Sequence, residues 1–180
     1  MDQSPPARLP DRGPRNQPPP SPVPDRGPLG QPPGSPGPST DFLVPIVDSE
    51  NAQFWEGTAI GELRMQSCSN CDRLRFPPRP MCPYCHSTRR SWKVMSGHAT
   101  IWSFIVAHAP LPPAYAQMSP YNVIIVSLDE DPVLRMVSSL LDHPGGAVNE
   151  VNPATIQIGE PVKAVFCEQA GIWFPRFVRA

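Results

Sequence analysis

Two pairs of cysteines carry the clearest chemical signal in this sequence. Two residues separate Cys68 from Cys71 and Cys82 from Cys85, and ten residues lie between the pairs. A Cys-x-x-Cys turn places two thiolates on one side of the backbone, where both can bind one zinc ion at ~2.3 Å. Two such turns complete a tetrahedron. Because four thiolates leave no open coordination position, we expect a structural zinc without a Lewis-acid role.

The segment around these cysteines is too small to fold on an apolar core alone. Its apolar residues are few: Leu63, Met65, Leu74, Phe76, Met81 and Tyr84. Zinc can supply ~10–16 kcal/mol of apparent binding free energy to such a unit. A redox dithiol would need only one cysteine pair, and His86 could replace one ligand, but four cysteines at this spacing favour a zinc ribbon over residues 63–91.

No catalytic motif is visible among the other reactive side chains. The four histidines lie in turns or at the ends of expected strands, where surface or capping roles are common: His86, His98, His108 and His143. Cys167 lies in an expected strand without an adjacent basic residue, so we expect a buried and inert thiol. The sequence also lacks a phosphate-binding glycine loop and a nucleophile elbow. It therefore favours a protein that is not an enzyme on its own.

Charge is unevenly distributed, although the whole chain carries only −1. Residues 62–93 hold seven basic and two acidic side chains, giving +5. Residues 41–61 and 94–180 hold four basic and eleven acidic side chains, giving −7. Nucleic-acid-binding domains usually carry a broader positive excess. The asymmetry favours a local anion site on a basic ribbon attached to an acidic body.

The first 40 residues differ in composition from the rest. They contain 14 of the 28 prolines and five glycines, with few large apolar side chains. Such a segment cannot bury enough apolar surface to offset the entropy of ordering it, so we expect a disordered, proline-rich tail over residues 1–40. A helical lead-in over residues 41–62 follows, with Ser49 as its cap, Gly61 near its end and Phe54, Trp55 and Ile60 available for one face.

The remaining residues, 92–180, alternate between short β-rich runs and turns. We expect a short strand at 92–95 and five main strands at 100–106, 122–128, 133–140, 162–168 and 172–178. Several short strands without a long amphipathic helix are typical of a small closed barrel. The predicted fold class is therefore mostly β, with a helix and a rubredoxin-like four-cysteine ribbon preceding a five-stranded OB-fold barrel.

The sequence also indicates where the protein resides. Its Met1 end lacks the apolar core of a signal peptide, and the longest aliphatic run, residues 123–126, is far too short to span a bilayer. We therefore expect a cytoplasmic protein. Thiols stay reduced in that compartment, which again favours metal ligation over disulfides.

A set of short motifs occurs in fixed order between about residues 45 and 178. The motifs are Phe54-Trp55-Glu56-Gly57, Arg75-Phe76-Pro77-Pro78-Arg79, Ser96-Gly97, Thr100-Ile101-Trp102-Ser103-Phe104, Pro120-Tyr121, the segment 158–166 and Phe174-Pro175-Arg176-Phe177. This order resembles the zinc-ribbon plus OB-fold family associated with acyl-CoA metabolism. The cysteine spacing alone is unspecific, whereas the ordered set is fairly specific, and the proline-rich tail lies outside it.

The resemblance implies an accessory role. Members of that family are typically non-catalytic partners of thiolase-like lipid-transfer proteins. Some are joined to acyl-CoA hydratase domains in steroid side-chain breakdown, and others bridge thiolase and hydroxymethylglutaryl-CoA synthase. By this resemblance, the barrel would lie against a thiolase-fold dimer and help form or cover the acyl-CoA path. The expected partner is thus a thiolase-like or lipid-transfer subunit or, as the alternative, an acyl-CoA hydratase; neither a membrane nor nucleic acid is expected.

The basic ribbon offers candidates for coenzyme A contacts. Coenzyme A carries a 3′-phosphate and a pyrophosphate, which Arg and Lys bind with charge-assisted hydrogen bonds. The candidates are Arg73, Arg75, Arg79 and Lys93. The alternative is an ordinary solvated basic face.

Two other functions stay open on the sequence alone. OB folds and zinc ribbons also bind nucleic acid, and Phe76 and Tyr84 could stack on bases. The acidic remainder and the lack of basic residues near Trp102 and Phe104 oppose that interpretation. An enzyme with an unrecognised site is the third candidate.

Overall fold

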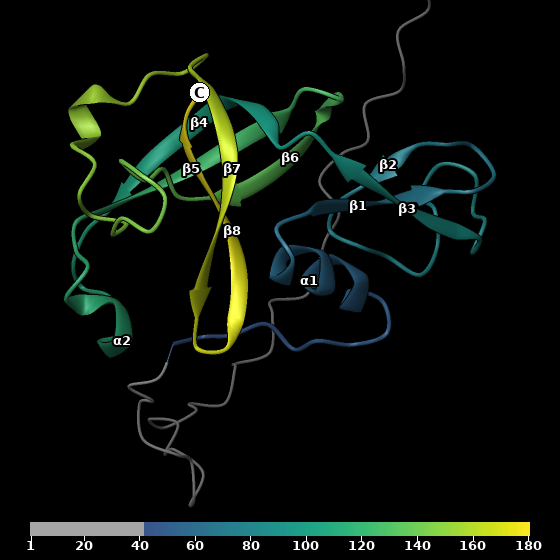
Figure 1. The fold of residues 1–180 in the computed structure, drawn as a ribbon, viewed down its shortest axis with the longest axis horizontal. Coiled ribbons are helices and arrows are strands. Elements are labelled where there is room, and N and C mark those ends of the chain that lie inside the picture. The colour runs from purple at the N-terminus through teal and green to yellow at the C-terminus, as the bar shows by residue number, and fades with distance from the viewer. Residues whose placement is uncertain (1–41) are drawn as a thin grey trace, which may run out of the picture. The chain divides into compact units, whose positions relative to one another are not determined.

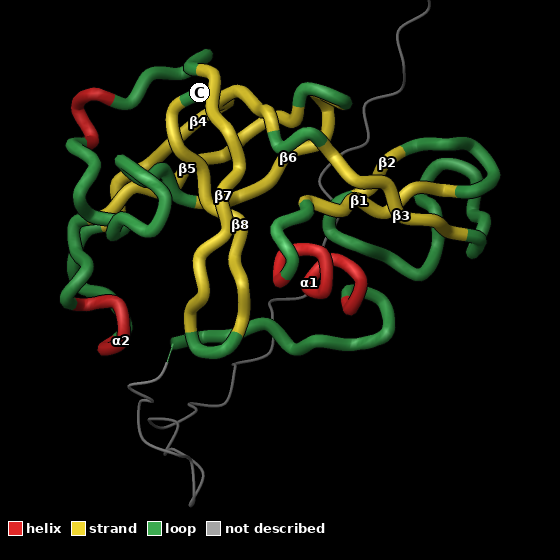
Figure 2. The backbone as a smooth tube through the Cα atoms, in the orientation of Figure 1, coloured by secondary structure: helices red, strands yellow, loops and turns green. Residues whose placement is uncertain are grey.

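A computed structural model of the protein describes residues 42–180, so the prediction of a disordered tail over residues 1–40 lies outside the described residues. Figure 1 shows the described elements as a small sheet with one helix beside a larger, strongly curved sheet, and Figure 2 distinguishes helices, strands and loops. Along the chain they are α1 (Ala52–Ala59), β1 (Leu63–Cys68), β2 (Leu74–Arg75), β3 (Arg90–Met95), β4 (His98–Ala107), α2 (Pro113–Ala116), β5 (Tyr121–Leu128), β6 (Asp131–Ser138), η1 (Pro153–Thr155), β7 (Pro161–Gln169) and β8 (Ile172–Arg179).

Helix α1 confirms the expected lead-in helix but not its cap. Asn51 is the N-cap, and the predicted cap, Ser49, lies in the preceding turn. That turn is held by the Asp48 carboxylate, which accepts hydrogen bonds from the backbone N–H groups of Glu50 and Asn51. The helix therefore starts later than predicted. Ile60, expected on the packed face, is 66% exposed because it follows the last helical residue.

The three short strands of the ribbon form an antiparallel sheet in the order β2-β1-β3. Six residue pairs join β1 to β3, from Leu63 opposite Met95 to Cys68 opposite Arg90. The expected strand at 92–95 thus begins earlier and pairs within the ribbon sheet. The pattern of alternating residues at 92–95 does not specify the partner strand, because strand pairing depends on residues distant in the sequence.

The larger sheet has the strand order β6-β5-β4-β7-β8 and is antiparallel throughout. Strand β5 alternates strictly between buried and half-buried residues, as expected for a strand with one face toward a core. An isolated parallel bridge between Leu140 and Phe177 joins the segment after β6 to β8 and brings the two sheet edges together. The predicted five-stranded OB-fold is confirmed.

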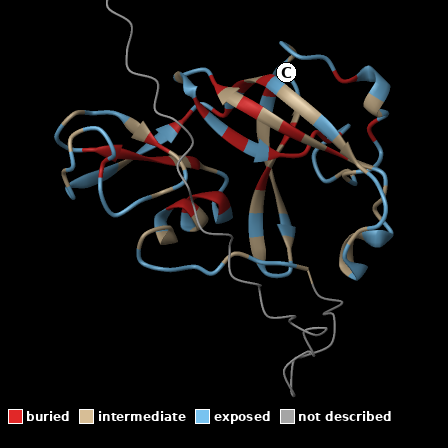
Figure 3. Cartoon of the chain, turned by 180° about the vertical axis from the view of Figure 1, so that it is seen from behind, coloured by how far each residue is buried: buried red, intermediate tan, exposed pale blue. Residues whose placement is uncertain are grey.

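One continuous apolar core lies inside the barrel and extends beneath the ribbon. Barrel residues such as Ile101, Ile124 and Phe177 belong to the same buried cluster as Phe54 of α1 and Leu63 of β1. Figure 3 shows buried residues along α1, β1 and the barrel strands. Because the base of the ribbon shares this core, it is anchored to the barrel, whereas its cysteine-bearing end lacks such support.

A glycine turn links the ribbon to the barrel. Gly97 lies between β3 and β4 with φ +81°, in a region that favours glycine. A Cβ at this position would lie 3.2 Å from the Cβ of Ala164 on β7. A larger residue would therefore have a strained backbone here and would require a small shift of β7.

Within residues 42–180, no helix combines the length and apolar character needed to traverse a lipid bilayer.

Candidate metal site and arginine-lined hollow

The four cysteines are positioned by two turns with the same backbone pattern. The N–H of Asp72 donates to the carbonyl of Cys68 at 2.9 Å, and the N–H of His86 donates to the carbonyl of Cys82 at 2.9 Å. Asp72 and His86 both have left-handed backbones, with φ 55° and 58°. Each turn folds its two cysteine side chains toward the same point. His86 occupies a turn position equivalent to that of Asp72 and is not part of the cluster of potential ligands found among the described residues.

The sulfur positions fit one tetrahedral metal ion. All four sulfurs lie within 4.8 Å of one another, with Cys68 and Cys85 at 3.5 Å and Cys71 and Cys82 at 3.7 Å. A tetrahedral site with zinc–sulfur bonds of ~2.3 Å has sulfur–sulfur edges of about 3.8 Å. Disulfide sulfurs would instead lie ~2.0 Å apart. Cys68 and Cys82 are fully buried and the other two are half-buried, so the cluster is shielded from water. The residues present therefore fit a four-thiolate metal site.

The thiols of the cluster differ in how readily they ionise to thiolates. In Cys82, burial opposes ionisation, but backbone N–H groups of Cys85 and Tyr84 outweigh it and lower the thiol pKa to about 6. In Cys71, the N–H of Arg73 favours the thiolate, but burial and the neighbouring sulfurs prevail and raise the pKa to about 12. Four thiolates cannot form together at neutral pH unless a cation offsets their repulsion. A divalent metal ion provides that charge.

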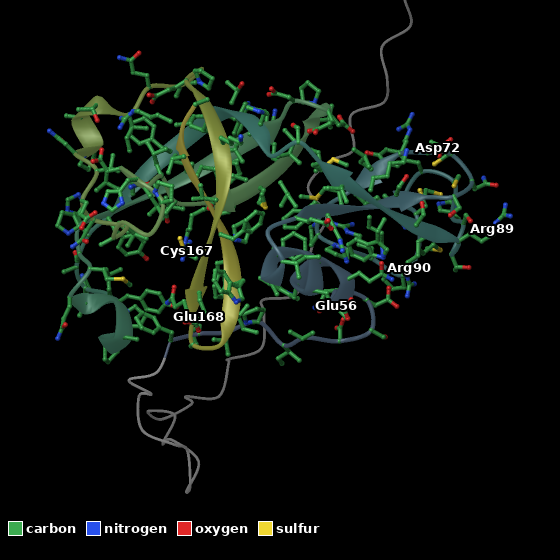
Figure 4. All side chains as sticks on the ribbon, in the orientation of Figure 1. Glu56, Asp72, Arg89, Arg90, Cys167 and Glu168 are labelled. Atoms are coloured by element: carbon green, nitrogen blue, oxygen red, sulfur yellow. The ribbon has the colours of Figure 1, made fainter. Side chains whose placement is uncertain are left out.

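The cysteine site lies at the end of the ribbon remote from the barrel. Asp72 and Arg89, which flank the two cysteine turns in sequence, lie at this outer end in Figure 4. The Arg89 guanidinium donates to the side-chain oxygen of Asn70 at 3.1 Å and so links the two sides of the site. This end of the ribbon is held by polar contacts and by the sulfurs, and not by the apolar core.

An arginine-lined hollow of about 210 Å³ lies between the ribbon and β6. Two of the predicted coenzyme A contacts, Arg75 and Arg79, line it, and Arg135 of β6 lines it from the barrel side. Asp131 is the one acidic residue among the lining side chains. The hollow thus carries an excess of two positive charges. We call it the arginine hollow.

Arg75 is the unusual member of this group. It is only 4% exposed, and the structure gives its three guanidinium nitrogens no hydrogen-bond partner among residues 42–180. A buried, unpaired cation is costly and raises the positive potential around it. Arg79 and Arg135 are exposed and can donate hydrogen bonds to a ligand. Arg75 is buried and contributes through the positive potential in the hollow.

The other two predicted contacts lie at different places. The guanidinium of Arg73 stacks over the ring of Tyr84, with 4.2 Å between its central carbon and the ring centroid, and Arg73 lines an adjoining hollow of about 230 Å³. The Lys93 amine lies 4.0 Å from a carboxylate oxygen of Asp72, and both groups are exposed. The structure therefore brings Arg75 and Arg79 together, places Arg73 next to them and keeps Lys93 apart.

Nothing in the sequence indicated that Arg135 lines the arginine hollow. It stands between Val133 and Val137 on an alternating strand, like many exposed arginines. Its guanidinium lies 3.7 Å from the ring centroid of Trp102 on β4, so the expectation that no basic residue lies near Trp102 was wrong. That contact depends on the register of three strands, which the sequence does not specify.

A second, mainly apolar hollow of about 350 Å³ lies between α1, the ribbon and the barrel. Aromatic residues from all three parts line it, including Trp55, Phe76 and Phe174. Phe76 lines the arginine hollow as well, so the two hollows adjoin at this ring. We call this second cavity the apolar hollow.

The remaining candidates of the sequence form no catalytic group within the described residues. All four histidines are exposed, and the single histidine–carboxylate contact found there joins His143 and Glu150 at 3.8 Å on the surface. Cys167, predicted to be buried, is half-buried, because β7 and β8 extend beyond the barrel as a hairpin. A basic residue, Arg176, does lie near it through the fold.

Comparison with protein families identifies both parts of the chain. Residues 55–89 match the description "ChsH2, rubredoxin-like zinc ribbon domain", and residues 92–167 match "ChsH2, C-terminal OB-fold domain". A solved structure described as "Ltp2-ChsH2(DUF35) aldolase" contains a similar chain with a TM-score of 0.64 and 32% identity. The similarity covers 76% of the present chain and 98% of that chain.

Curated relatives add functional names. The "3-oxo-4,17-pregnadiene-20-carboxyl-CoA hydratase alpha subunit" of Mycobacterium tuberculosis is 32% identical over 124 residues, which are 69% of this chain and 36% of the relative. A "DUF35 domain-containing scaffold protein" of Methanocaldococcus jannaschii is 28% identical over 100 residues, 55% of this chain and 63% of the relative. The chain spans about a third of the length of the curated hydratase subunits it matches.

Proposed function

Because this chain belongs to the ChsH2 family of zinc-ribbon and OB-fold proteins, we propose that it is a non-catalytic accessory subunit of an enzyme that acts on acyl-CoA thioesters. In this role it binds a partner of the thiolase or lipid-transfer type and holds part of the partner's acyl-CoA substrate. The names of its relatives support an aldolase or hydratase assembly and a steroid or other lipid acyl group.

The metal in this proposal is a structural zinc ion. Cys68, Cys71, Cys82 and Cys85 would hold it, and the spacing of their sulfurs supports a tetrahedral site. When bound, the ion supplies charge compensation and a rigid turn pair, and no reactive position. Its function is to fix the outer ribbon, from which the segment carrying Arg75 and Arg79 extends toward the barrel.

A non-catalytic role accords with the arrangement of titratable groups. Catalytic acids and bases generally gather in a cleft with strongly shifted pKa values. Within residues 42–180, the histidines are dispersed and exposed, and the large cysteine shifts belong to the metal site. The reaction would therefore be performed by the partner.

The arginine hollow is the observation that carries the acyl-CoA proposal. Phosphate groups prefer guanidinium donors, which form charge-assisted hydrogen bonds. Arg79 and Arg135 can contact a phosphate there, and buried Arg75 adds to the field. The adjoining apolar hollow begins at Phe76 and suits the less polar part of the same ligand. A basic pocket beside an apolar one matches the two ends of an acyl-CoA molecule.

Exposed apolar residues on the outer face of the barrel support a protein partner. Val133 and Val137 of β6 are 78% and 65% exposed, and Ile105 of β4 is 63% exposed. Trp102 lies on β4 beneath Arg135. Apolar side chains gathered on one face of a sheet are typical of interaction surfaces. Arg135 would therefore stand between the partner and the arginine hollow.

Binding measurements on the purified partner complex test this proposal. Octanoyl-CoA is titrated against the wild-type complex and a complex carrying Arg79→Glu and Arg135→Glu, with 3′-dephospho-CoA as a second probe. We expect the double variant to lose about tenfold or more in affinity, since each charged hydrogen bond contributes ~1.5–3 kcal/mol. Lys163→Glu on β7 is the matched control, because this exposed residue lies outside the hollow.

Unchanged octanoyl-CoA affinity in the double variant would remove the arginine hollow from the proposal. Turnover by the isolated chain would contradict the accessory role. Salt-sensitive binding of single-stranded DNA, with no effect of acyl-CoA, would instead support a nucleic-acid-binding protein.

A further inference from the structure

A second arginine, Arg176 on β8, lies half-buried without an acidic partner. No carboxylate of residues 42–180 forms an ion pair with it, and its one hydrogen bond is donated to the side-chain oxygen of Gln169 at 3.3 Å. Burial lowers the pKa of this guanidinium, but Arg stays charged at neutral pH. Most of its five N–H donors are therefore available to a ligand.

The groups around Arg176 are mostly aromatic or weakly polar. Its neighbours include Cys167, Tyr115 and Tyr121. The ring of Phe174 lies 5.6 Å from its guanidinium carbon. The cation thus lies among aromatic and weakly polar groups, and within residues 42–180 Glu168 is the one acidic residue that lines the hollows beside it.

Glu168, the acidic residue of the β7–β8 hairpin, forms no ion pair with this arginine. Arg176 pairs with Val165, and Phe174 pairs with Cys167, so these residues share one face of the β7–β8 hairpin. Glu168 follows Cys167 on β7, and both are labelled in Figure 4. It is exposed, its carboxylate accepts a hydrogen bond from the N–H of Gly171, and it lines the same hollow as Cys167 and Arg176. Arg176 therefore has no ion-pair partner in the hairpin, although the Glu168 side chain lines one of its hollows.

Two hollows on the α2 side of the hairpin meet at Arg176. One, of about 250 Å³, is lined by Tyr115 and Tyr121 together with Phe174, and the other, of about 220 Å³, is lined by Cys167 and the Gly145–Gly146 turn. OB folds bind ligands on the outer face between the loop after their first strand and the loop between their last two strands. Here those loops are the α2 segment and the tip of the β7–β8 hairpin. The arginine thus stands at the ligand-binding face of the barrel fold.

We propose that this face is a binding site for a single carboxylate carried on an apolar body, with Arg176 as its cationic contact and the two hollows as its apolar surround. Arg176 does not line the arginine hollow, but it does line the apolar hollow, so this site adjoins the cavity proposed above for the less polar part of acyl-CoA. One planar guanidinium matches one carboxylate in a bidentate arrangement. A polyanion would find no second cation, since no other Arg or Lys lines these hollows.

The proposal is tested by NMR on the full chain, through the side-chain Nε–H resonance of Arg176. Benzoate is the probe and benzamide its neutral counterpart, which differs only in the carboxylate. We expect benzoate to shift this resonance at millimolar concentrations and benzamide to leave it unchanged. Arg176→Gln should weaken benzoate binding about tenfold, followed through the amides of the hairpin, because one charged hydrogen-bonding group is lost.

Two further variants keep the result interpretable. Arg176→Lys retains the charge without the planar fork, so it should bind benzoate more weakly than wild type and better than Arg176→Gln, even if the glutamine variant perturbs the hairpin. Arg179→Gln on the same strand should bind like wild type. Equal shifts with benzamide, no shift with benzoate, or unaltered binding by Arg176→Gln would each overturn the proposal.

The source of the carboxylate is then distinguished with peptides. The capped tripeptide Leu-Glu-Leu is compared with Leu-Gln-Leu and with benzoate. Tighter binding of the glutamate peptide than of benzoate assigns the site to an acidic side chain of a protein partner. The reverse order assigns it to a free carboxylic acid.

Discussion

The outer ribbon and the barrel are ordered by different interactions. The barrel encloses large apolar side chains such as Ile101, Ile124 and Phe177, none of which is exposed. Beyond Cys68, the ribbon buries Cys82 and Arg75 but no large apolar side chain. Its two turns instead bring four sulfurs together. The barrel should therefore respond to lost methylene groups and the outer ribbon to lost metal, and the two responses should separate experimentally.

Loss of the metal should have the largest local effect. We expect Cys82→Ser, or strong chelation of the wild-type protein, to abolish zinc binding and to remove hydrogen-exchange protection from the amides of Asp72 and His86. Both amides are held by the cysteine turns. Amides of β5 in the barrel should stay protected, because the apolar core does not depend on the sulfurs.

The control for this experiment is Cys167→Ser. This thiol lies outside the cluster of four, so the variant should keep one zinc per chain. Concerted loss of protection in β5 and the cysteine turns would show that ribbon and barrel unfold as one unit.

Removing a large barrel side chain should give the converse result. Phe177 is fully buried, and its backbone closes the barrel through the β-bridge to Leu140. We expect Phe177→Ala to lower the free energy of unfolding by ~3–5 kcal/mol. Urea denaturation followed by tryptophan fluorescence measures this, and zinc content should stay at one per folded chain. A similar loss from Phe76→Ala, which removes a half-buried ring in the ribbon, would contradict the distinction.

A buried amide makes a smaller but specific contribution to the barrel. The Asn122 side chain is fully buried, donates to the carbonyls of Leu140 and Val148 at 2.9 and 3.1 Å, and accepts from the N–H of Leu140 at 2.7 Å. Asn122→Leu leaves these backbone groups without partners and should cost ~1–3 kcal/mol. Urea denaturation measures the free energy of unfolding of this variant and of Ser127→Ala, a half-buried control on the same strand. Equal decreases in the two variants would show that the amide has no special role.

The smallest expected effect concerns pH and the junction between the two regions. Burial acts to raise the pKa of Glu130, but the N–H of Ser96 donates to its carboxylate at 2.5 Å and lowers the pKa overall. The contact should therefore stabilise the protein above the ordinary Glu pKa of ~4.3 and lose that effect as the pH falls through the lowered pKa. Because the group is largely exposed, we expect less than about 1 kcal/mol.

A comparison with Glu130→Gln isolates this contribution. The difference in melting temperature between the two proteins should be present at neutral pH and vanish under acid conditions. A difference that persists at low pH would show that the carboxylate charge is not its cause.

The sequence predicted the barrel strands and the cysteine site because their signals are local. Alternation in residues 121–128 and paired Cys-x-x-Cys turns depend on a few neighbouring residues. The pairing of β3 with β1, the burial of Arg75 and the position of Arg135 depend on partners distant in the chain. The N-cap of α1 was also predicted wrongly, because Asp48, Ser49 and Asn51 are all common capping residues and the sequence does not show which one occupies the cap.

X-ray absorption at the zinc edge tests the central claim of a closed, four-thiolate ribbon most directly. Freshly purified protein should contain one zinc ion per chain, with four sulfur neighbours at about 2.3 Å and no lighter ligand. The absence of bound metal, or nitrogen or oxygen in its first coordination shell, would contradict the account.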